Sequence, residues 1–155
     1  MVLEHLFVGG LLRVLWLSGP VSAEVMRPQV DNAGYDLVIE VNDVIRHIQL
    51  KSSDRDAKTA RQNIHLHLAR KPSGCVIWMQ FDPESLDLGP FLWFGGLPGE
   101  PLPALDDFKV AKHTKGDATG RKAERPMLRV VPKRRFEVIE TIEEIVDALF
   151  FDGHA

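Results

Sequence analysis

The sequence predicts an α/β or α+β domain in which helices flank one central mixed β-sheet. Apolar residues recur every three or four positions over residues 3–17 and 141–150, as in amphipathic helices. Between them, residues 35–41 and 46–53 alternate apolar and polar side chains, and residues 75–81 are almost continuously apolar. The first two patterns are typical of half-buried strands, and the third is typical of a strand covered on both faces.

The composition is that of an ordinary globular chain. It has 155 residues, 45% hydrophobic and 26% charged, with a formal net charge of −3. This length predicts a single domain over residues 1–155. The one cysteine, Cys75, lies in an apolar run, so we expect a small core residue and a reducing, cytoplasmic setting. Glu4 and Arg13 interrupt the apolar N-terminal segment, so we expect neither a secretory signal nor a membrane partner.

The two terminal helices have recognisable ends. The first is followed by the Ser18-Gly19-Pro20 stop signal. The second opens with Thr141 and Glu144, which have the spacing of a capping box. Its predicted inward side chains are Ile142, Ile145, Val146 and Leu149.

The segment 54–70 is compatible with two structures. Ala57, Ala60, Ile64 and Leu68 have helical spacing, whereas Ile64, Leu66 and Leu68 also alternate as in a strand. We favour the helix. Beyond it we expect strands at 91–94 and 127–131, loops at 82–90 and 95–103, and no regular periodicity over 106–120.

The two strands at 35–41 and 46–53 predict a β-hairpin around the turn signal Asn42-Asp43. Asp36 belongs to the polar face of the first strand, and Gln49 and Lys51 belong to that of the second. Cross-strand neighbours lie about 5 Å apart, so we expect these three side chains to converge. Leu50 would point into the core and leave its main-chain carbonyl as a possible metal ligand.

Such a constellation suits the hydrolysis of a phosphodiester. That reaction needs a divalent cation to polarise the phosphoryl oxygen and activate a water, and a positive group to stabilise the transition state. Magnesium prefers hard oxygen ligands, usually one or two carboxylates with waters. The hairpin offers a carboxylate, an amide oxygen and a lysine.

The pattern of Asp36, twelve spacer residues and Gln49-Leu50-Lys51 resembles the PD-(D/E)XK nuclease superfamily, which has the restriction-endonuclease-like fold. Its neighbouring words, Gly34-Tyr35-Asp36-Leu37 and the run from Ile48 to Ser53, look like the GxDL and IQVKS stretches of small bacterial members. The motifs cover about the first 53 residues. A leading helix that carries an acid, here Glu4, also fits.

The resemblance implies a metal-dependent DNA endonuclease with a restriction-endonuclease-like core. Asp36 would be the principal ligand of Mg²⁺ or Mn²⁺, with Gln49, the Leu50 carbonyl and Glu4 completing the site. Lys51 would orient the attacking water or stabilise the developing charge. Such small nucleases often dimerise to cut both strands, so a homodimer or higher homo-oligomer is expected.

Gln49 departs from the family pattern, which usually has Asp or Glu at this position. Glutamine offers an oxygen but no negative charge. Some members, including an intron-type homing endonuclease group, resemble this chain in using Gln there. Glu40, on the same strand face as Asp36, could restore a carboxylate, as could Glu4.

Positive charge is concentrated in the segment 109–135. Ten Lys or Arg residues stand there against Asp117 and Glu124, a local balance of +8. Segregated positive charge on a net-acidic chain predicts a surface for the phosphate backbone of DNA. The candidate contact residues are Lys109, Lys112, Lys115, Arg121, Lys122, Lys133, Arg134 and Arg135.

Other interpretations remain open. A nucleic-acid-binding module of the same fold without turnover is one, and a structural or regulatory partner protein is another. The paired His65 and His67 could ligate zinc, although no third Cys or His has a supporting spacing. Trp78 is expected in the core, and Trp93 and Phe94 are either core residues or a base-stacking platform.

Overall fold

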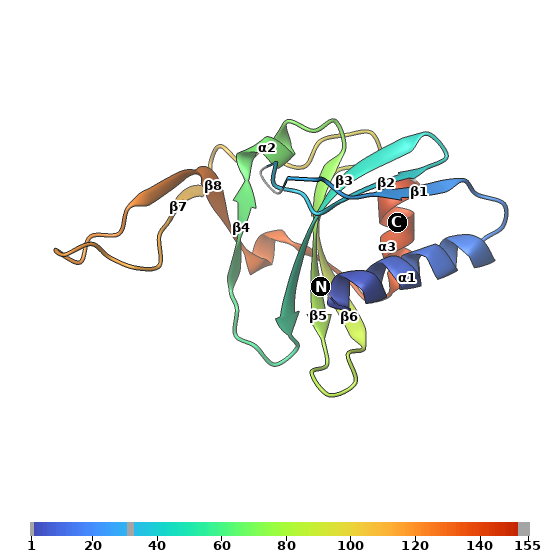
Figure 1. Cartoon of the computed structure of the whole chain (residues 1–155), viewed down its shortest axis with the longest axis horizontal. Helices are drawn as coiled ribbons and strands as arrows, with labels where there is room; N and C mark the ends of the chain where they lie inside the picture. Colours follow the sequence, from blue (N-terminus) through green and yellow to red (C-terminus); the bar gives the residue numbers. More distant parts are fainter. Residues whose placement is uncertain (1, 31–32, 152–155) are drawn as a thin grey trace.

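A computed structural model describes residues 2–30 and 33–151 of the chain. It is a mixed α+β structure built on a six-stranded sheet with the strand order β1-β2-β3-β5-β6-β9 (Figure 1). β3 and β5 are parallel, and the other neighbouring pairs of this sheet are antiparallel. A separate three-stranded sheet has the order β4-β8-β7. The predicted fold class, a central mixed sheet flanked by helices, is therefore confirmed.

The elements follow one another in the order α1, β1 to β4, α2, β5 to β8, η1, β9 and α3. Their bounds are α1 Val2–Leu17, β1 Ala23–Met26, β2 Leu37–Val41, β3 Val44–Asp54, β4 Arg61–His65, α2 Leu66–Ala69, β5 Gly74–Phe81, β6 Leu88–Gly95, β7 Lys109–Lys112, β8 Glu124–Pro132, the 3₁₀ helix η1 Lys133–Arg135, β9 Glu137–Ile139 and α3 Ile142–Phe150. None of the helices in these described ranges is long and apolar enough to cross a membrane.

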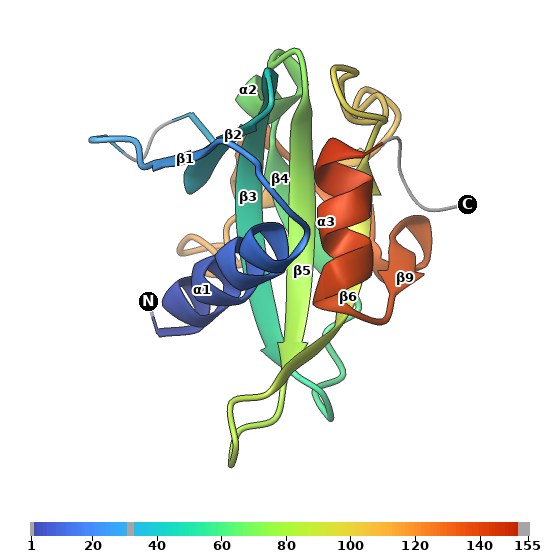
Figure 2. The ribbon, with the colours of Figure 1, turned by 90° about the vertical axis from the view of Figure 1, so that its right-hand side faces the viewer.

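The central sheet is covered on both faces. α1 and α3 pack on one face, where Phe7, Leu11 and Leu149 are fully buried or nearly so (Figure 2). The second sheet and the short α2 cover part of the other face, where Ile64, Leu68 and other apolar side chains form a second core. This two-sided covering explains why β5 reads as an unbroken apolar run.

The predicted hairpin is present and has the predicted faces. Leu37 pairs with Ile48, and both side chains are completely buried under the helices. Asn42 and Asp43 form the tight connection with φ values of 46° and 71°, which Asn and Asp tolerate better than most residues. Because side chains alternate along a strand, the residues between the buried ones point to the opposite face.

The helix favoured for residues 54–70 is wrong over most of that range. Residues 61–65 form β4, and only Leu66–Ala69 is helical. β4 pairs with β8, more than 60 positions later, and Ile64 is buried in the second core. This long-range pairing decides between two local patterns of similar strength. β1, β7 and β9 are short strands that the periodicity did not indicate.

Several smaller predictions are confirmed. α3 begins after Thr141, whose hydroxyl accepts a hydrogen bond from the Glu144 amide at 3.2 Å. The strands expected at 91–94 and 127–131 lie within β6 and β8. Trp78, Trp93 and Phe94 are core residues with at most 6% of their surface exposed. Cys75 is also completely buried, and burial raises the pKa of its thiol to about 12.

Candidate metal site and nucleic-acid groove

The site lies where β2 begins beside the middle of β3. Asp36 immediately precedes β2, and its main-chain amide donates to the Ile48 carbonyl at 2.8 Å. Its carboxylate oxygen Oδ2 accepts a hydrogen bond from the Leu50 amide at 2.7 Å. These two contacts place Asp36 beside the stretch of β3 from Ile48 to Leu50, which contains Gln49. The carboxylate is held against the backbone of β3.

Gln49 carries a buried oxygen that lacks a protein partner. Its Oε1 atom is inaccessible to solvent and has no hydrogen-bond partner among the described residues. Leaving a buried acceptor unsatisfied costs about 1–3 kcal/mol. Such an oxygen is well suited to a cation or to a water molecule held beside the Asp36 carboxylate.

The Leu50 carbonyl has an orientation consistent with a third ligand. The Leu50 side chain packs against the helix-covered core. In a strand, the N–H and C=O of one residue point to the same side. The Leu50 amide donates to Asp36, so the Leu50 carbonyl also points toward the side of β3 on which Asp36 lies.

These donors fit a hard divalent cation. Within the ranges that the structure describes, no three His, Cys, Asp or Glu side chains gather as a metal-binding group. The hairpin donors are of a different kind, because they combine one carboxylate with a side-chain amide oxygen and a main-chain carbonyl. Magnesium is commonly bound through one or two carboxylates, with waters in the remaining positions.

The two additional candidate acids occupy different places. Glu4 is in α1, and its Oε1 atom accepts from Arg27 Nε at 2.8 Å in a half-exposed ion pair. Glu40 pairs with Ile45 near the far end of the hairpin. It lies four residues along β2 from Asp36, roughly 13 Å at the usual rise per residue. One cation cannot contact both carboxylates, so Glu40 drops out of the ligand set.

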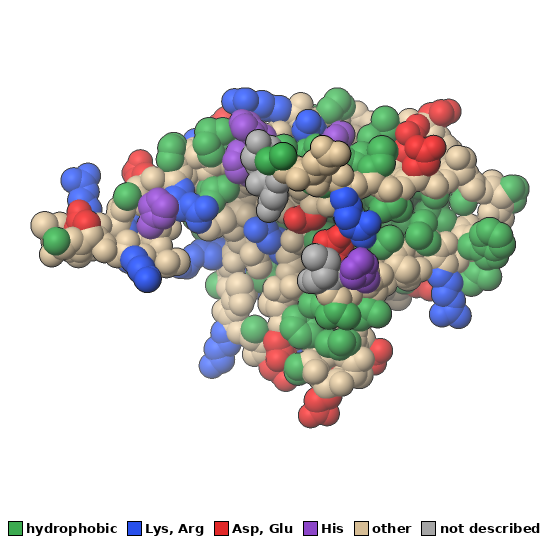
Figure 3. Space-filling view, viewed as in Figure 1, with side chains coloured by type: hydrophobic (Ala, Val, Ile, Leu, Met, Phe, Trp, Pro, Cys, Tyr) green, Lys and Arg blue, Asp and Glu red, His purple; other side chains and the backbone are tan. Residues whose placement is uncertain are grey.

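Lys51 connects the hairpin to a large basic groove. It lies two residues after Gln49, on the same face of β3, and is paired in register with Trp78. Lys51 lines a groove with a volume of about 1150 Å³ between the central sheet and the β7–β8 side of the molecule. The groove has seven Lys or Arg side chains and one carboxylate, Asp107. Lys and Arg side chains are also spread along the β7–β8 side of the molecule in Figure 3.

Five of the eight predicted nucleic-acid contacts line this groove. They are Lys109, Lys112, Lys122, Arg134 and Arg135. Lys115 and Arg121 lie instead beyond it, around a smaller hollow near the end of the β7–β8 hairpin. Lys133 places its ammonium 5.7 Å from the centre of the Trp78 ring, a cation–π contact at the base of β8.

Two residues at the site were missed by sequence reasoning. Arg61 lines the groove from β4, and its role was hidden because a helix was predicted there. His47 lies on the same β3 face as Gln49, and its Nδ1 atom is buried without a partner among the described residues. Burial, with a smaller effect of Lys71, lowers the pKa of His47. The alternation of β3 could have indicated His47, but nothing singled it out.

The histidine pair has a structural role in the described fold. His65 precedes α2, and its Nδ1 atom accepts from the His67 amide at 3.1 Å as a helix cap. The two rings lie 4.6 Å apart, centroid to centroid. Together with the missing third ligand, this arrangement gives no support to a zinc site.

The fold and site define a mixed α+β protein with a polar hairpin beside a basic groove. No protein-family model matches the chain, and no curated protein matches it. Among solved structures it is similar to a bacterial homing endonuclease at 23% identity, with a TM-score of 0.29. That alignment covers 57% of this chain and 56% of the other. The similarity is too low to carry an argument about either the fold or the activity.

Proposed function

We propose that this chain is a divalent-cation-dependent endonuclease that acts on DNA, with the restriction-endonuclease-like core that its motifs resemble. The observation that carries the proposal is the place of Lys51. It follows Gln49 by two residues on the same face of β3, and it is one of the seven basic side chains that line the groove. A nuclease needs these two features side by side, because the scissile phosphate must reach the metal ligands while the flanking phosphates are neutralised.

The proposal gives each hairpin residue a role. Asp36, Gln49 and the Leu50 carbonyl would hold Mg²⁺, or Mn²⁺ in its place. The bound cation would supply the polarisation of the phosphoryl oxygen and the activation of water. Lys51 would place its ammonium against the phosphate and stabilise the charge that develops there.

Glu4 remains in the proposed set as an exchangeable ligand. Exposed ion pairs such as Glu4–Arg27 contribute only about 0.2–1 kcal/mol, so releasing Glu4 from Arg27 costs little. A carboxylate from α1 would compensate for the charge that Gln49 lacks. The expected homodimer or higher oligomer and the cytoplasmic setting stay predictions.

Plasmid cleavage with and without Mg²⁺ tests the proposal. We expect Asp36→Ala and Lys51→Ala to lose about 100-fold or more of the cleavage rate, as for a group that stabilises transition-state charge. Asp56→Ala and Lys58→Ala are matched controls, because both residues are exposed and neither lines the groove. These controls should cleave like the wild-type chain.

A second function is favoured by the uncharged Gln49 side chain: a DNA-binding module without turnover. It predicts no cleavage in Mg²⁺ or Mn²⁺, together with DNA binding that weakens steeply as salt rises. Cleavage that is equal in the wild type, Asp36→Ala and Lys51→Ala would reject the assigned site. Absence of binding even at low salt would reject both functions and favour a protein partner.

A further inference from the structure

The β7–β8 hairpin extends beyond the body of the molecule as an arm, defined as residues 112–125 (Figure 1). Every residue of the arm is exposed, whereas Ala111 at its root is buried. The fold gains no core from the arm. The side chains of the arm are therefore accessible to a partner.

The side chains of the arm indicate the chemistry of that partner. Five are Lys or Arg and two are acidic, Asp117 and Glu124. None is Phe, Tyr, Trp, Leu, Ile, Val or Met, and alanine is the largest apolar side chain. A protein interface usually places aromatic or aliphatic side chains at its centre. The arm therefore suits a polyanion.

The same composition distinguishes between nucleic acids. Proteins that bind single strands commonly stack bases on aromatic side chains, and the arm has no such platform. Minor-groove binders that kink DNA insert apolar wedges, which are absent from the arm. The major groove of A-form RNA is too deep and narrow for protein side chains to read. The major groove of B-form duplex DNA, about 12 Å wide, is open to a projecting protein segment of this kind.

The arm is mostly the loop that joins β7 to β8, and main-chain hydrogen bonds hold the two sides of this loop together. Beyond the pairs of β7 and β8, the His113 amide donates to the Ala123 carbonyl at 2.8 Å. The Asp117 amide donates to the Arg121 carbonyl at 2.9 Å. About seven residues separate the root from the tip, so each side of the loop can reach at most roughly 20 Å when it is extended. That reach exceeds the depth of the major groove, about 8.5 Å.

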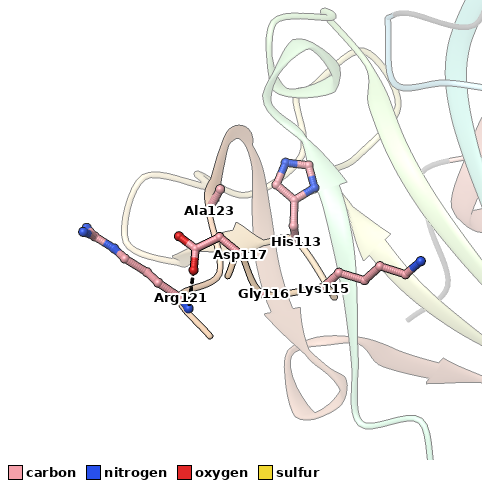
Figure 4. Close-up of a pocket in the computed structure, with 6 residues that line it drawn as sticks. All are labelled: His113, Lys115, Gly116, Asp117, Arg121 and Ala123. Carbon is pink, nitrogen blue, oxygen red and sulfur yellow. Dashed lines mark hydrogen bonds between the residues drawn. The ribbon is translucent and has the colours of Figure 1, made fainter. Parts of the chain in front are cut away.

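The tip is fixed by Asp117. Its Oδ1 atom accepts from the Thr119 amide at 2.9 Å, the Thr119 hydroxyl at 2.7 Å and the Arg121 amide at 3.0 Å. In Figure 4 the Arg121 side chain extends outward from this turn and the Lys115 side chain extends in another direction. The backbone of Arg121 is thus held in place while its guanidinium faces solvent.

We propose that the arm enters the major groove of duplex DNA and that Arg121 contacts base edges there, which makes the arm a specificity element. This inference rests on the proposed DNA binding, but not on cleavage. The basic groove at the root of the arm would hold the phosphate backbone. Arginine suits the reading role because its planar fork pairs with the N7 and O6 atoms of guanine.

The test measures DNA binding by the full chain in EDTA, so that metal-dependent cleavage does not contribute to the result. A preferred duplex is first selected from a random pool. Binding is then compared with the same duplex carrying glucosylated 5-hydroxymethylcytosine, which fills the major groove, and with the duplex in the presence of a minor-groove ligand. We expect the bulky major-groove groups to weaken binding about tenfold or more, and the minor-groove ligand to have under about a twofold effect.

Two variants separate base recognition by the arm from the effect of its charge. Arg121→Lys keeps the charge but loses the fork, and should lower the preference for the selected duplex over a random one by roughly 5- to 150-fold. Asp117→Ala removes a negative charge and also the hydrogen bonds that hold the turn at the tip. It should raise affinity for random duplex while lowering the preference. Lys58→Ala, outside the arm, is the control.

The outcomes are distinct. Equal binding to the modified and unmodified duplexes, or an unchanged preference in both arm variants, overturns the inference and leaves DNA binding by the body intact. Absence of binding to any duplex overturns both this inference and the proposed function. Selective, groove-dependent binding without cleavage in Mg²⁺ supports the arm while rejecting the enzyme.

Discussion

At the residue scale, Arg46 shows how an apparently misplaced charge supports the fold. It is fully buried on the helix-covered face of β3. Its guanidinium donates to the carbonyls of Leu149 at 2.7 Å, Ala148 at 3.1 Å and Gly96 at 2.9 Å. The first two belong to the last turn of α3, where a cation complements the helix dipole. Arg46 thus ties α3 to the sheet, although burial lowers its pKa.

Replacing Arg46 with Met should destabilise the protein by about 2–4 kcal/mol. The substitution leaves buried carbonyls without donors, and each such loss costs about 1–3 kcal/mol. Urea unfolding followed by circular dichroism gives the measurement. Arg13→Met is the control because Arg13 is exposed on α1, and it should change stability by less than about 0.5 kcal/mol. Similar effects in the two variants would refute this role.

In the proposed metal site, Gln49 supplies an oxygen without a negative charge. Changing it to Glu should tighten Mn²⁺ binding by about tenfold, equivalent to roughly 1.4 kcal/mol. Without metal, the same carboxylate would be buried beside Asp36, so the melting temperature in EDTA should fall. Calorimetric titration measures the expected gain in Mn²⁺ affinity, and thermal unfolding in EDTA measures the expected loss of stability.

The control for this substitution is Glu40→Gln. Glu40 lies on β2, roughly 13 Å along the strand from Asp36, and should leave the affinity for Mn²⁺ unchanged. If Gln49→Glu binds Mn²⁺ no better than the wild type, Oε1 does not face the cation.

At the scale of elements, the conformation of the chain segment that leads into β2 depends on one glycine. Gly34 has a φ of 80°, and a Cβ atom there would lie 2.5 Å from the Cβ atom of His65. Only glycine fits both the backbone conformation and the contact with β4. Since Asp36 follows two residues later, this contact also fixes where the carboxylate enters the site.

Gly34→Ala should therefore cost about 1–3 kcal/mol of stability and also weaken Mn²⁺ binding. Gly9→Ala is a matched control in the exposed part of α1, where an added Cβ meets nothing within 4 Å. That control should stabilise the helix by about 0.5–1 kcal/mol. Thermal unfolding and Mn²⁺ titration of both variants make the comparison. Loss of stability with full Mn²⁺ affinity would separate Gly34 from the site.

The elements also show what sequence can predict. The β2–β3 hairpin was predictable because its pattern, its turn residues and its register are all local. The strand β4 was not, because its alternative helical pattern was equally good and the deciding partner, β8, lies more than 60 residues away. The candidate site follows the same rule: one hairpin is enough to indicate Asp36 and Gln49, whereas Arg61 and the groove depend on the second sheet.

At the scale of the whole molecule, the two faces of the central sheet are covered differently. One face is closed by α1 and α3 and gives the larger core. On the other face, the second sheet leaves the basic groove open beside Lys51. The net charge of −3 conceals this division, because the positive charge gathers on the β7–β8 side.

Each Lys or Arg side chain in the groove should therefore contribute to the salt dependence of DNA binding. Arg61→Ala and Lys109→Ala should each reduce the slope of log affinity for duplex DNA against log salt by about 1. Affinity should fall similarly on all sequences, because phosphate contacts carry no sequence information. Arg13→Ala, on α1, should leave the slope unchanged. Filter-binding or anisotropy series between low and moderate salt give the slopes.

A crystal of the chain soaked in Mn²⁺ tests the central claim most directly. Anomalous difference density reports the cation itself, independent of cleavage. We predict a single strong peak that contacts the Asp36 carboxylate, Gln49 Oε1 and the Leu50 carbonyl. A crystal with no peak at this place, or with Mn²⁺ bound only at other carboxylates, would contradict the assignment of the hairpin as a metal site.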